Sequence, residues 1–354
     1  MKAPQLVKSG ILTLVLVVVS LASWEFYLRN KGITTDYDDG ESLWSDKRAM
    51  VYGAIDQSTV FIGSSRIKYD LDIETWIAIT GDQPIQLAIE GNSPRPVLED
   101  LANDKNFKGR VVVDVTEGLF FSSSPNNNSD PEGRIAYYKK RTPAQRFSFL
   151  VNHALESQFV FLDKSNFSLA SLIDRVPVKK RNGVFAMPCE FPMDFGRVTF
   201  DRQDVMTKKF LSDTNLQNQV KGIWQFFGKI NDELPASGKK LDSVMMSVKA
   251  ACDKIKSRGG QVLFVRTPSS GPYFEAEIKG FPRAKYWDQL LKITNCPGIH
   301  FKDYPPIDHF QCPEFSHLSP SDAIIFTKNF IKILVEEKNW HFKKQITTPV
   351  TGLF

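Results

Sequence analysis

The chain contains 354 residues, of which 42% are hydrophobic and 24% are charged, so it can bury a sizeable core. Its 45 lysines and arginines exceed its 40 aspartates and glutamates by five charges, and no basic run is interleaved with aromatic residues. The composition therefore excludes a fibrous or disordered chain, and it does not indicate a nucleic-acid-binding protein.

An apolar segment near the N-terminus, residues 10–28, is long enough to cross a lipid bilayer as a helix. Its one charged residue, Glu25, lies near the far end, beside aromatic residues that suit the headgroup layer. Lys2 and Lys8 precede the segment, and basic residues favour the cytoplasmic side. We therefore expect residues 1–9 to be cytoplasmic and residues 10–28 to form a transmembrane signal-anchor.

A cleaved signal peptide is the alternative interpretation of this segment. Small residues near its end offer a cleavage site, namely Ser20, Ala22 and Ser23. Both interpretations carry the rest of the chain across the membrane. The anchor predicts a single-pass membrane protein with an extracytoplasmic main domain, which is periplasmic if the cell is Gram-negative.

Short apolar runs that alternate with helical patterns predict an α/β fold with a mostly parallel sheet. A polar stretch, 29–54, is typical of a linker, and the runs then follow at 58–63, 84–89, 110–116, 261–267 and 298–301. The third run is apolar apart from Asp114, as is usual for a strand buried on both faces. Ligands bind beyond the carboxyl ends of such strands, so the loops there are the ones to search.

The alternation is interrupted between residues 121 and 237, where turn-rich and mixed sequence predicts a partly helical insertion that could form a lid or substrate-binding surface. It resumes with a helical pattern from Leu241. A capping-box sequence at Ser319 starts a closing helix that runs to about Glu337. We expect one domain over residues 55–340 containing this insertion, followed by a tail over 341–354.

A candidate nucleophile follows the first run, which ends in Gly63-Ser64-Ser65-Arg66. A serine just past a strand can expose its hydroxyl at the edge of the sheet, and a following helix directs its N–H groups there. An ordinary Gly-Ser turn gives the same short sequence. The decision therefore depends on whether a base accompanies Ser65.

His317 is the candidate base, because it lies just before the closing helix with Glu314 three residues earlier. A nucleophilic serine needs a base within hydrogen-bond reach, and the base needs a carboxylate that fixes its tautomer. Glu314 can supply that carboxylate from the same tight loop. A loop histidine without a catalytic role is the alternative.

Together these segments resemble the SGNH (GDSL-type) hydrolase superfamily. The matching features are a strand ending in FIGSSR, a glycine turn in QLAIEGNSP, and an acidic-x-x-His-Leu sequence before the last helix. Within this superfamily, the segments are similar to those of membrane-anchored members that work beside membrane-bound O-acyltransferases, such as the D-alanyl transfer protein of teichoic acid synthesis. The resemblance covers 58–337 without the insertion, and it implies a three-layer α/β/α fold.

The resemblance also implies roles for individual residues. Ser65 matches the nucleophile, with Ser64 at the usual aspartate position, and His317 matches the catalytic histidine. Glu314 occupies the position of the aspartate that orients it. Gly91 matches the glycine whose N–H group, with that of Ser65, forms the oxyanion hole.

One departure from the family concerns the oxyanion hole. The family has an asparagine donor after the third strand, where this chain reads Thr116-Glu117-Gly118. Asn92, beside Gly91, is a candidate replacement. Loss of one oxyanion donor typically costs about 2.7–4 kcal/mol of transition-state stabilisation.

Other polar residues near the predicted strand ends allow further interpretations. Arg66 and Arg266 are candidates for binding an anionic substrate group, and plain surface charges are the alternative. A zinc site is a further alternative, although its spacing matches no familiar pattern, with His309, Cys312 and His317 as ligands. We expect neither a metal nor another cofactor. Four cysteines allow a disulfide, for example between Cys296 and Cys312.

We therefore expect a serine esterase or O-acyltransferase that acts through an acyl-enzyme on Ser65. The resemblance implies an acylated envelope glycan, or another acyl ester, as substrate and a membrane-bound O-acyltransferase as partner. A non-catalytic partner or scaffold of such an acyltransferase is the alternative, and the missing asparagine favours it. Sequence leaves open whether water or a glycan hydroxyl accepts the acyl group.

Overall fold

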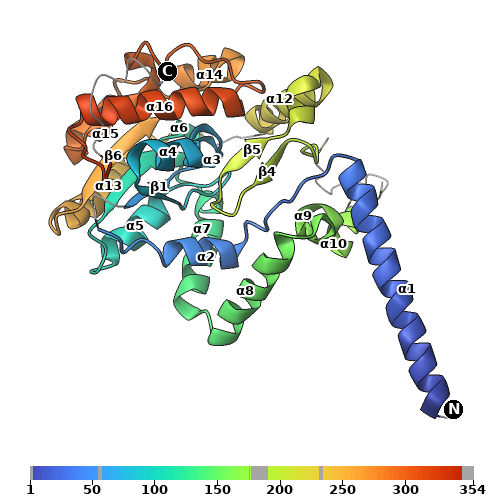
Figure 1. The fold of residues 1–354 in the computed structure, drawn as a ribbon. Coiled ribbons are helices and arrows are strands. Elements are labelled where there is room, and N and C mark those ends of the chain that lie inside the picture. Colours follow the sequence, from blue (N-terminus) through green and yellow to red (C-terminus); the bar gives the residue numbers. More distant parts are fainter. Residues whose placement is uncertain (1–2, 55–57, 175, 177–189, 231–233, 345–354) are drawn as a thin grey trace. The chain divides into compact units, whose positions relative to one another are not determined.

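The computed structural model describes residues 3–54, 58–174, 176, 190–230 and 234–344 (Figure 1). The chain divides into two compact units, which are described separately. The first unit contains the chain up to Asp38 together with the segment 142–186. The second contains 39–141 and the segment from 187 onward. Most of the tail expected at 341–354 lies outside the described residues.

The second unit is built on a five-stranded parallel sheet with the strand order β2-β1-β3-β6-β7. Its strands are β1 (Ser58–Ile62), β2 (Gln83–Gln86), β3 (Arg110–Asp114), β6 (Gln261–Arg266) and β7 (Gly298–His300). Every residue of β1 and β3 is buried, which explains the apolar runs at 60–62 and 111–113. The expected α/β fold with a mostly parallel sheet is confirmed.

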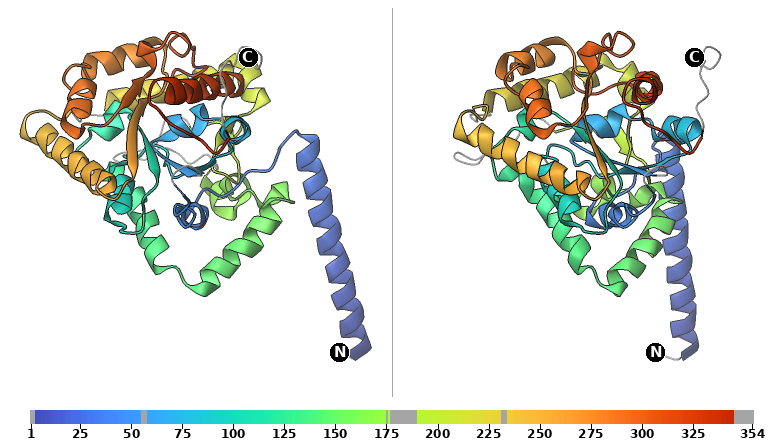
Figure 2. Two further views of the ribbon diagram at one scale, coloured as in Figure 1. Left: turned by 60° about the vertical axis from the view of Figure 1, so that its left-hand side comes forward. Right: turned by 90° about the vertical axis from the view of Figure 1, so that its left-hand side faces the viewer.

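Helices pack against both faces of this sheet, as the alternating side chains of β1 show. Val60 and Ile62 belong to one buried cluster, whereas Phe61 belongs to a second cluster. The first face is covered by α5 (Arg95–Asn103), α13 (Lys239–Lys256) and α15 (Trp287–Thr294). The second face is covered by α3 (Ser65–Asp70), α4 (Ile73–Thr80) and α16 (Pro320–Glu336). Figure 2 shows α13 and α16 on opposite sides of β6.

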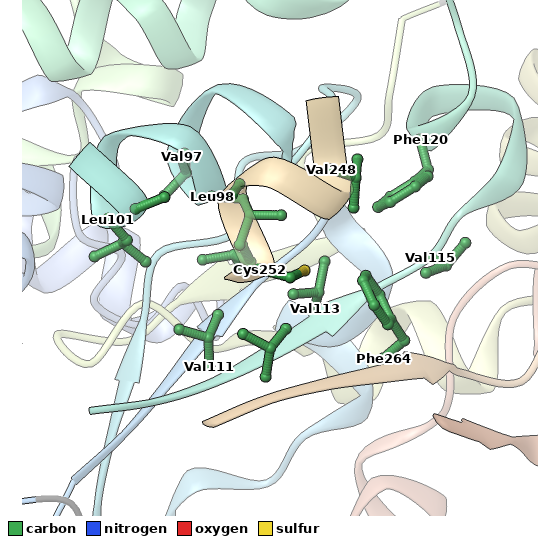
Figure 3. Packing of buried hydrophobic residues seen from close by; sticks show 14 of the residues in the cluster. Val97, Leu98, Leu101, Val111, Val113, Val115, Phe120, Val248, Cys252 and Phe264 are labelled. Atoms are coloured by element: carbon green, nitrogen blue, oxygen red, sulfur yellow. The ribbon is translucent and has the colours of Figure 1, made fainter. Parts of the chain in front are cut away.

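The first cluster is the larger of the two described here, and it joins α5 and α13 to the middle of the sheet. In Figure 3, Leu98 of α5 and Cys252 of α13 point toward Val113 of β3. All three side chains are at most 1% exposed. Burial of side chains of this kind stabilises a fold by roughly 1.5–3 kcal/mol each.

The segment expected to be a linker contains a helix, α2 (Glu41–Arg48), which packs into the second unit. Trp44 is fully buried, and its indole N–H donates to the carbonyl of Leu87 at 3.1 Å. Arg48 is buried in an ion pair with Asp100. Residues 41–48 are therefore an integral part of the domain.

The segment expected to be an insertion, 121–237, is divided between the two units. Its part in the second unit contains α7 (Asn126–Lys140), β4 (Gly196–Val198), β5 (Asp204–Met206), α11 (Lys208–Ser212) and α12 (Thr214–Ile230). The remaining elements of the second unit are α6 (Glu117–Phe120), α14 (Gly271–Gly280) and a 3₁₀ helix, η2 (Phe301–Asp303).

The β4–β5 hairpin is attached to the carboxyl end of β2 by one arginine. Arg202 is fully buried, and its guanidinium donates to the carbonyls of Gln86 at 2.6 Å and Ala88 at 2.9 Å. It also forms an ion pair with Asp39. Burial acts to raise the pKa of Asp39, but Arg202 and Lys68 outweigh it and hold that pKa well below its usual value.

The first unit consists of α1 (Ala3–Asn30), α8 (Pro143–Glu156), η1 (Val160–Leu162), α9 (Lys164–Phe167) and α10 (Leu169–Asp174). Residues 4–30 of α1 have a mean hydropathy of 2.2 in their most apolar window, and this helix is long and apolar enough to span a membrane. The expected N-terminal apolar helix is therefore confirmed.

The disulfide suggested between Cys296 and Cys312 is wrong. Cys296 lies in the cluster on one face of the sheet and Cys312 in the cluster on the other. Both are free thiols, as is Cys252, and Cys189 lies outside the described residues. The sheet itself separates the two sulfurs, so this pairing would require the fold to open.

Gly63, directly after β1, has no room for a side chain. A Cβ atom on Gly63 would lie 2.6 Å from the Cβ of Asp114 and 2.7 Å from the Cγ2 of Ile67. Gly63→Ala should therefore lower the free energy of unfolding by about 1–3 kcal/mol through overpacking. Urea denaturation monitored by circular dichroism measures this change.

The matched control for this substitution is Gly133→Ala in α7, where an added Cβ meets nothing within 4 Å. Alanine is a better helix former than glycine, so the control should gain about 0.5–1 kcal/mol. Equal unfolding free energies for Gly63→Ala and the wild type would contradict the close approach described here.

Candidate active site

The structure separates the two serines that follow β1. Ser64 is 2% exposed, and its hydroxyl shares a 2.7 Å hydrogen bond with that of Thr116. Ser65 begins α3 and remains partly exposed. Of these two hydroxyl groups, only that of Ser65 is therefore placed to meet a ligand.

His317 connects Ser65 to Glu314. Its Nε2 lies 2.8 Å from the Ser65 hydroxyl oxygen, and its Nδ1 lies 2.9 Å from Oε1 of Glu314. His317 is 1% exposed and Glu314 is fully buried. A serine, an imidazole and a carboxylate in this order are the arrangement that activates a serine hydroxyl as a nucleophile.

A strained turn gives Glu314 its position. Phe315 has a φ of +80°, which is unfavourable for a bulky side chain and is found mainly where surrounding structure enforces it. The turn allows Oε1 of Glu314 to accept the backbone N–H of His317 at 2.7 Å as well as that of Ser316. The carbonyl of Phe315 accepts the N–H of Ser270 at 2.9 Å, which holds the turn against the loop before α14.

Aromatic side chains surround the imidazole. The ring of Tyr69 lies 4.5 Å from that of His317, and the rings of Phe195 and Trp224 each lie 6.0 Å away. Trp224, on α12, also donates its indole N–H to Oε2 of Glu314. Both oxygens of this carboxylate are therefore bound, which fixes its orientation toward His317.

Asp70, the last residue of α3, connects this helix to the segment that follows His317. Its Oδ1 accepts the backbone N–H of Leu318 at 2.9 Å. Burial raises the pKa of Asp70 well above its usual value, and the neighbouring Asp114 adds to the effect. Because α3 begins at Ser65, this bond helps to hold the serine and the histidine at a fixed separation.

Arg66 and Arg266 are buried, which does not support the expectation that they bind substrate. Each side chain is 1% exposed and forms an ion pair with Glu277 on α14. Arg266 also binds Glu117 at 3.0 Å. Burial acts to raise the pKa of Glu277, but Arg266 and Arg66 outweigh it and hold the pKa below its usual value. The two arginines therefore stabilise the residues around the site through buried ion pairs.

The candidate oxyanion donors differ in whether their N–H groups already donate a hydrogen bond within the protein. Gly91 has a φ of +66°, and its N–H and that of Ser65 donate to no described part of the chain. The side-chain amide of Asn92 instead donates to the carbonyl of Glu90 at 2.8 Å. Asn92 is thus engaged within its own loop, so a role as the replacement donor is not supported. Thr116 is occupied as well, because it binds Ser64.

The alternative zinc ligands do not converge. His317 faces Ser65, whereas the imidazole of His309 is exposed and lies 3.2 Å from the carbonyl of Pro305. Cys312 is buried in the cluster beneath α16. Among the described residues, no group of three or more His, Cys, Asp or Glu side chains could hold a metal ion.

Three residues at the site were missed by sequence reasoning, namely Tyr69, Asp70 and Trp224. Tyr69 follows Ser65 by four residues, so helical spacing offered a signal for it, whereas Asp70, five residues on, had none. Trp224 lies in the segment expected to be an insertion and had no local signal. Comparison with known protein families and with curated proteins finds no match for this sequence.

Asp70 makes a pH-dependent contribution to stability. Its folded pKa lies above the unfolded value of about 3.9, so its contribution is present below that pH and is lost as the pH rises through the folded pKa. Asp70→Asn removes the ionisation and keeps an oxygen for Leu318. We expect its unfolding free energy, relative to wild type, to rise between pH 4 and pH 8.

Asp70→Ala is the control, because it also removes the ionisation but leaves the N–H of Leu318 without an acceptor. It should lose about 1–3 kcal/mol relative to Asp70→Asn at every pH. Denaturation of the three proteins at pH 4, 6 and 8 measures both effects. A difference between Asp70→Asn and wild type that stays constant with pH would disprove the raised pKa.

Proposed function

We propose that this chain is a serine-dependent esterase or O-acyltransferase of the SGNH hydrolase type, with Ser65 as its nucleophile. The observation that carries the proposal is the pair of hydrogen bonds of His317, at 2.8 Å to Ser65 and 2.9 Å to Glu314. Stability alone does not require a buried histidine to lie between a serine and a carboxylate. Acyl transfer requires both partners, the serine as nucleophile and the carboxylate to orient the histidine.

The chemistry follows from these contacts. His317 accepts the proton of the Ser65 hydroxyl as its oxygen attacks the acyl carbonyl, and Glu314 stabilises the imidazolium that forms. The N–H groups of Ser65 and Gly91 stabilise the developing oxyanion. Collapse of the tetrahedral intermediate releases the alcohol, protonated by His317, and leaves an acyl group on Ser65. Water or a glycan hydroxyl then takes the acyl group.

The position of the site in the fold supports the same proposal. Ser65 follows β1, and ligands of open parallel sheets bind beyond the carboxyl ends of the strands. Helices on both faces of the sheet are compatible with the three-layer α/β/α arrangement of SGNH hydrolases. Fold alone does not establish activity, so the argument depends on the three side chains.

The proposed substrate is an acyl ester, such as an acetyl ester, of an envelope glycan. The apolar helix α1 supports it, because a membrane anchor would place the second unit outside the cytoplasm, at the cell envelope. A membrane-bound O-acyltransferase is the partner that would supply or receive the acyl group.

A non-catalytic partner of an acyltransferase is the second candidate function. The observation that favours it concerns the segment after β3, where the family has its asparagine donor. Its polar side chains are already engaged within the protein, because Thr116 binds Ser64 and Glu117 binds Arg266. Neither residue is an asparagine with a free amide. The partly exposed Ser65 and its bond to His317 favour catalysis, because a scaffold has no use for them.

Covalent labelling tests the proposed nucleophile. The full chain in detergent, treated with a fluorophosphonate probe, should be labelled at Ser65 and should hydrolyse a chromogenic acetate ester. Ser65→Ala should abolish both activities, and His317→Ala should lower the labelling rate by about 10²–10⁴-fold through loss of the general base. Gel fluorescence and mass spectrometry of the labelled peptide measure these results.

Ser64→Ala is the matched control, because it removes a neighbouring hydroxyl that is buried against Thr116. It should retain labelling. Loss of labelling in Ser64→Ala but not in Ser65→Ala would reverse the assignment. Folded wild-type protein that neither labels nor hydrolyses the ester would favour the non-catalytic partner.

Trp224 is expected to act as a positioning residue for Glu314. Trp224→Phe keeps an aromatic ring beside His317 but removes the N–H that binds Oε2 of Glu314. A hydrogen bond to a charged group contributes about 1.5–3 kcal/mol, so the labelling rate should fall roughly tenfold or more. Ester hydrolysis should show the loss in kcat with KM little changed.

The control for Trp224→Phe is Trp340→Phe, which removes a buried indole from the cluster beneath α16. Its labelling rate should equal that of the wild type. Equal effects of the two substitutions would show that general loosening of the fold, and not the bond to Glu314, accounts for the change.

A further inference from the structure

An exposed apolar face in the first unit has no partner within the part of the chain that the structure describes. It lies on α8, where Phe147, Leu150, Val151 and Leu155 follow helical spacing and share one side of the helix. Phe147 is 69% exposed and Leu150 is 59% exposed. No described residue of α8 is buried, so this amphipathic helix lacks the core contact that such a face normally makes.

The opposite side of α8 is already occupied. His153 contacts the ring of Tyr37 at 5.6 Å and that of Phe149 at 6.1 Å. Asn152 and Glu156 line a cavity within the unit, together with Leu155. The side that packs within the unit therefore carries these polar groups and His153, whereas Phe147, Leu150 and Val151 are exposed.

The unit is fixed to the C-terminal end of the apolar helix α1. Glu25 of α1 accepts the backbone N–H groups of Val160 at 3.0 Å and Phe161 at 3.1 Å, in η1 directly after α8. Arg29 binds Glu25 and the carbonyl of Gln158. Figure 1 shows α9 and α10 near this end of α1. The outward face of α8 therefore belongs to a unit held at one end of a membrane-length helix.

The aromatic residues at this end of α1 indicate the depth of the contact. The rings of Trp24 and Tyr27 stack at 5.5 Å, and Trp24 meets Phe167 of α9 edge-on at 6.3 Å. Tryptophan and tyrosine gather at the boundary between acyl chains and headgroups. The contact between α1 and α9 thus lies at that boundary if α1 spans the bilayer.

We propose that α8 and α10 form a second membrane contact, lying in the interface of the same bilayer that α1 spans. Leu169, Leu172 and Ile173 on α10 are 49–74% exposed, so α10 carries an apolar surface of its own in the same unit. The inference rests on the proposed membrane anchor and adds a separate claim about the 142–174 segment. An amphipathic helix of this kind buries its apolar face at the boundary between headgroups and acyl chains.

The charges beside the segment favour anionic lipid as the occupant. In the sequence, Lys140 and Arg141 precede α8, and a second basic group follows α10, at Arg175, Lys179, Lys180 and Arg181. Basic residues that flank an interfacial helix are attracted by anionic headgroups. A protein partner would not need basic groups on both flanks of the apolar segment, so we commit to the bilayer.

The test uses the full chain, reconstituted in vesicles of phosphatidylcholine and phosphatidylglycerol whose acyl chains are brominated or unbrominated. One environment-sensitive fluorescent amino acid replaces a single residue at a time. The test positions are Leu150 on α8 and Leu172 on α10. Asn152 on the opposite side of α8 is the matched control, and Leu16 in the middle of α1 reports on the anchor.

Labels at Leu150 and Leu172 should lose about half of their emission or more in brominated vesicles, as the label at Leu16 does, because all three contact acyl chains. The label at Asn152 should be quenched far less. Phe147→Asn should reduce the quenching at Leu150 and leave that at Leu16 unchanged, since it weakens only the interfacial helix.

Each other outcome overturns the inference in a distinguishable way. Quenching at Leu16 without quenching at Leu150 or Leu172 leaves the anchor intact and removes the second contact. A label at Leu150 that is shielded from aqueous iodide but not quenched by bromine shows that a second copy of the chain, and not lipid, covers α8. Absence of quenching at Leu16 removes the anchor and this inference together, while fluorophosphonate labelling of Ser65 still decides the proposed activity.

Discussion

The hydrogen bond between Ser65 and His317 joins residues that are 252 positions apart in the chain, so the candidate site exists only when the whole sheet is assembled. Several local features converge on this bond. Asp70 binds the N–H of Leu318, and the Ser319 hydroxyl caps α16 by accepting the N–H of Asp322. Because α16 packs on α3, Ser65 at the start of α3 and His317 just before α16 are brought within hydrogen-bond distance.

Buried ion pairs stabilise the position of α3, which begins at Ser65. Arg66 follows Ser65 directly, and Glu277 on α14 binds both Arg66 and Arg266, so α3, β6 and α14 share one carboxylate. Removal of one partner from a buried pair typically costs about 3–5 kcal/mol, because the other charge is then left in a low-dielectric interior. The arrangement therefore couples the orientation of α3 to the end of β6. It also explains why Arg66, beside the candidate nucleophile, is buried in an ion pair.

Sequence predicted the sheet and the three side chains of the candidate site, Ser65, His317 and Glu314, more readily than the residues that hold them in place. A short, continuous apolar run such as 111–113 is typical of a strand buried on both faces, and Glu314 and His317 lie close enough in sequence to be found together. In contrast, Trp224 reaches Glu314 across 90 residues, so only the assembled fold reveals their contact. Helix α2 is short and mostly polar, and its burial depends on Leu43 and Trp44. Arg66 and Arg266 are candidates for binding an anionic group in the sequence alone, because sequence cannot show that Glu277 neutralises them.

The bonds of Glu25 have a further consequence for the helix that carries it. A single apolar helix turns easily about its own axis in lipid, because one face is as soluble as another. If α1 spans the bilayer, rotation of α1 alone would break the two hydrogen bonds that the Glu25 carboxylate accepts from the N–H groups of η1 and leave its charge without these donors. The hydrogen bonds of residues 158–161 therefore hold α1 in one rotational orientation within the first unit. In a membrane, α1 would then present one constant side to its surroundings, which is what specific pairing with another transmembrane helix requires.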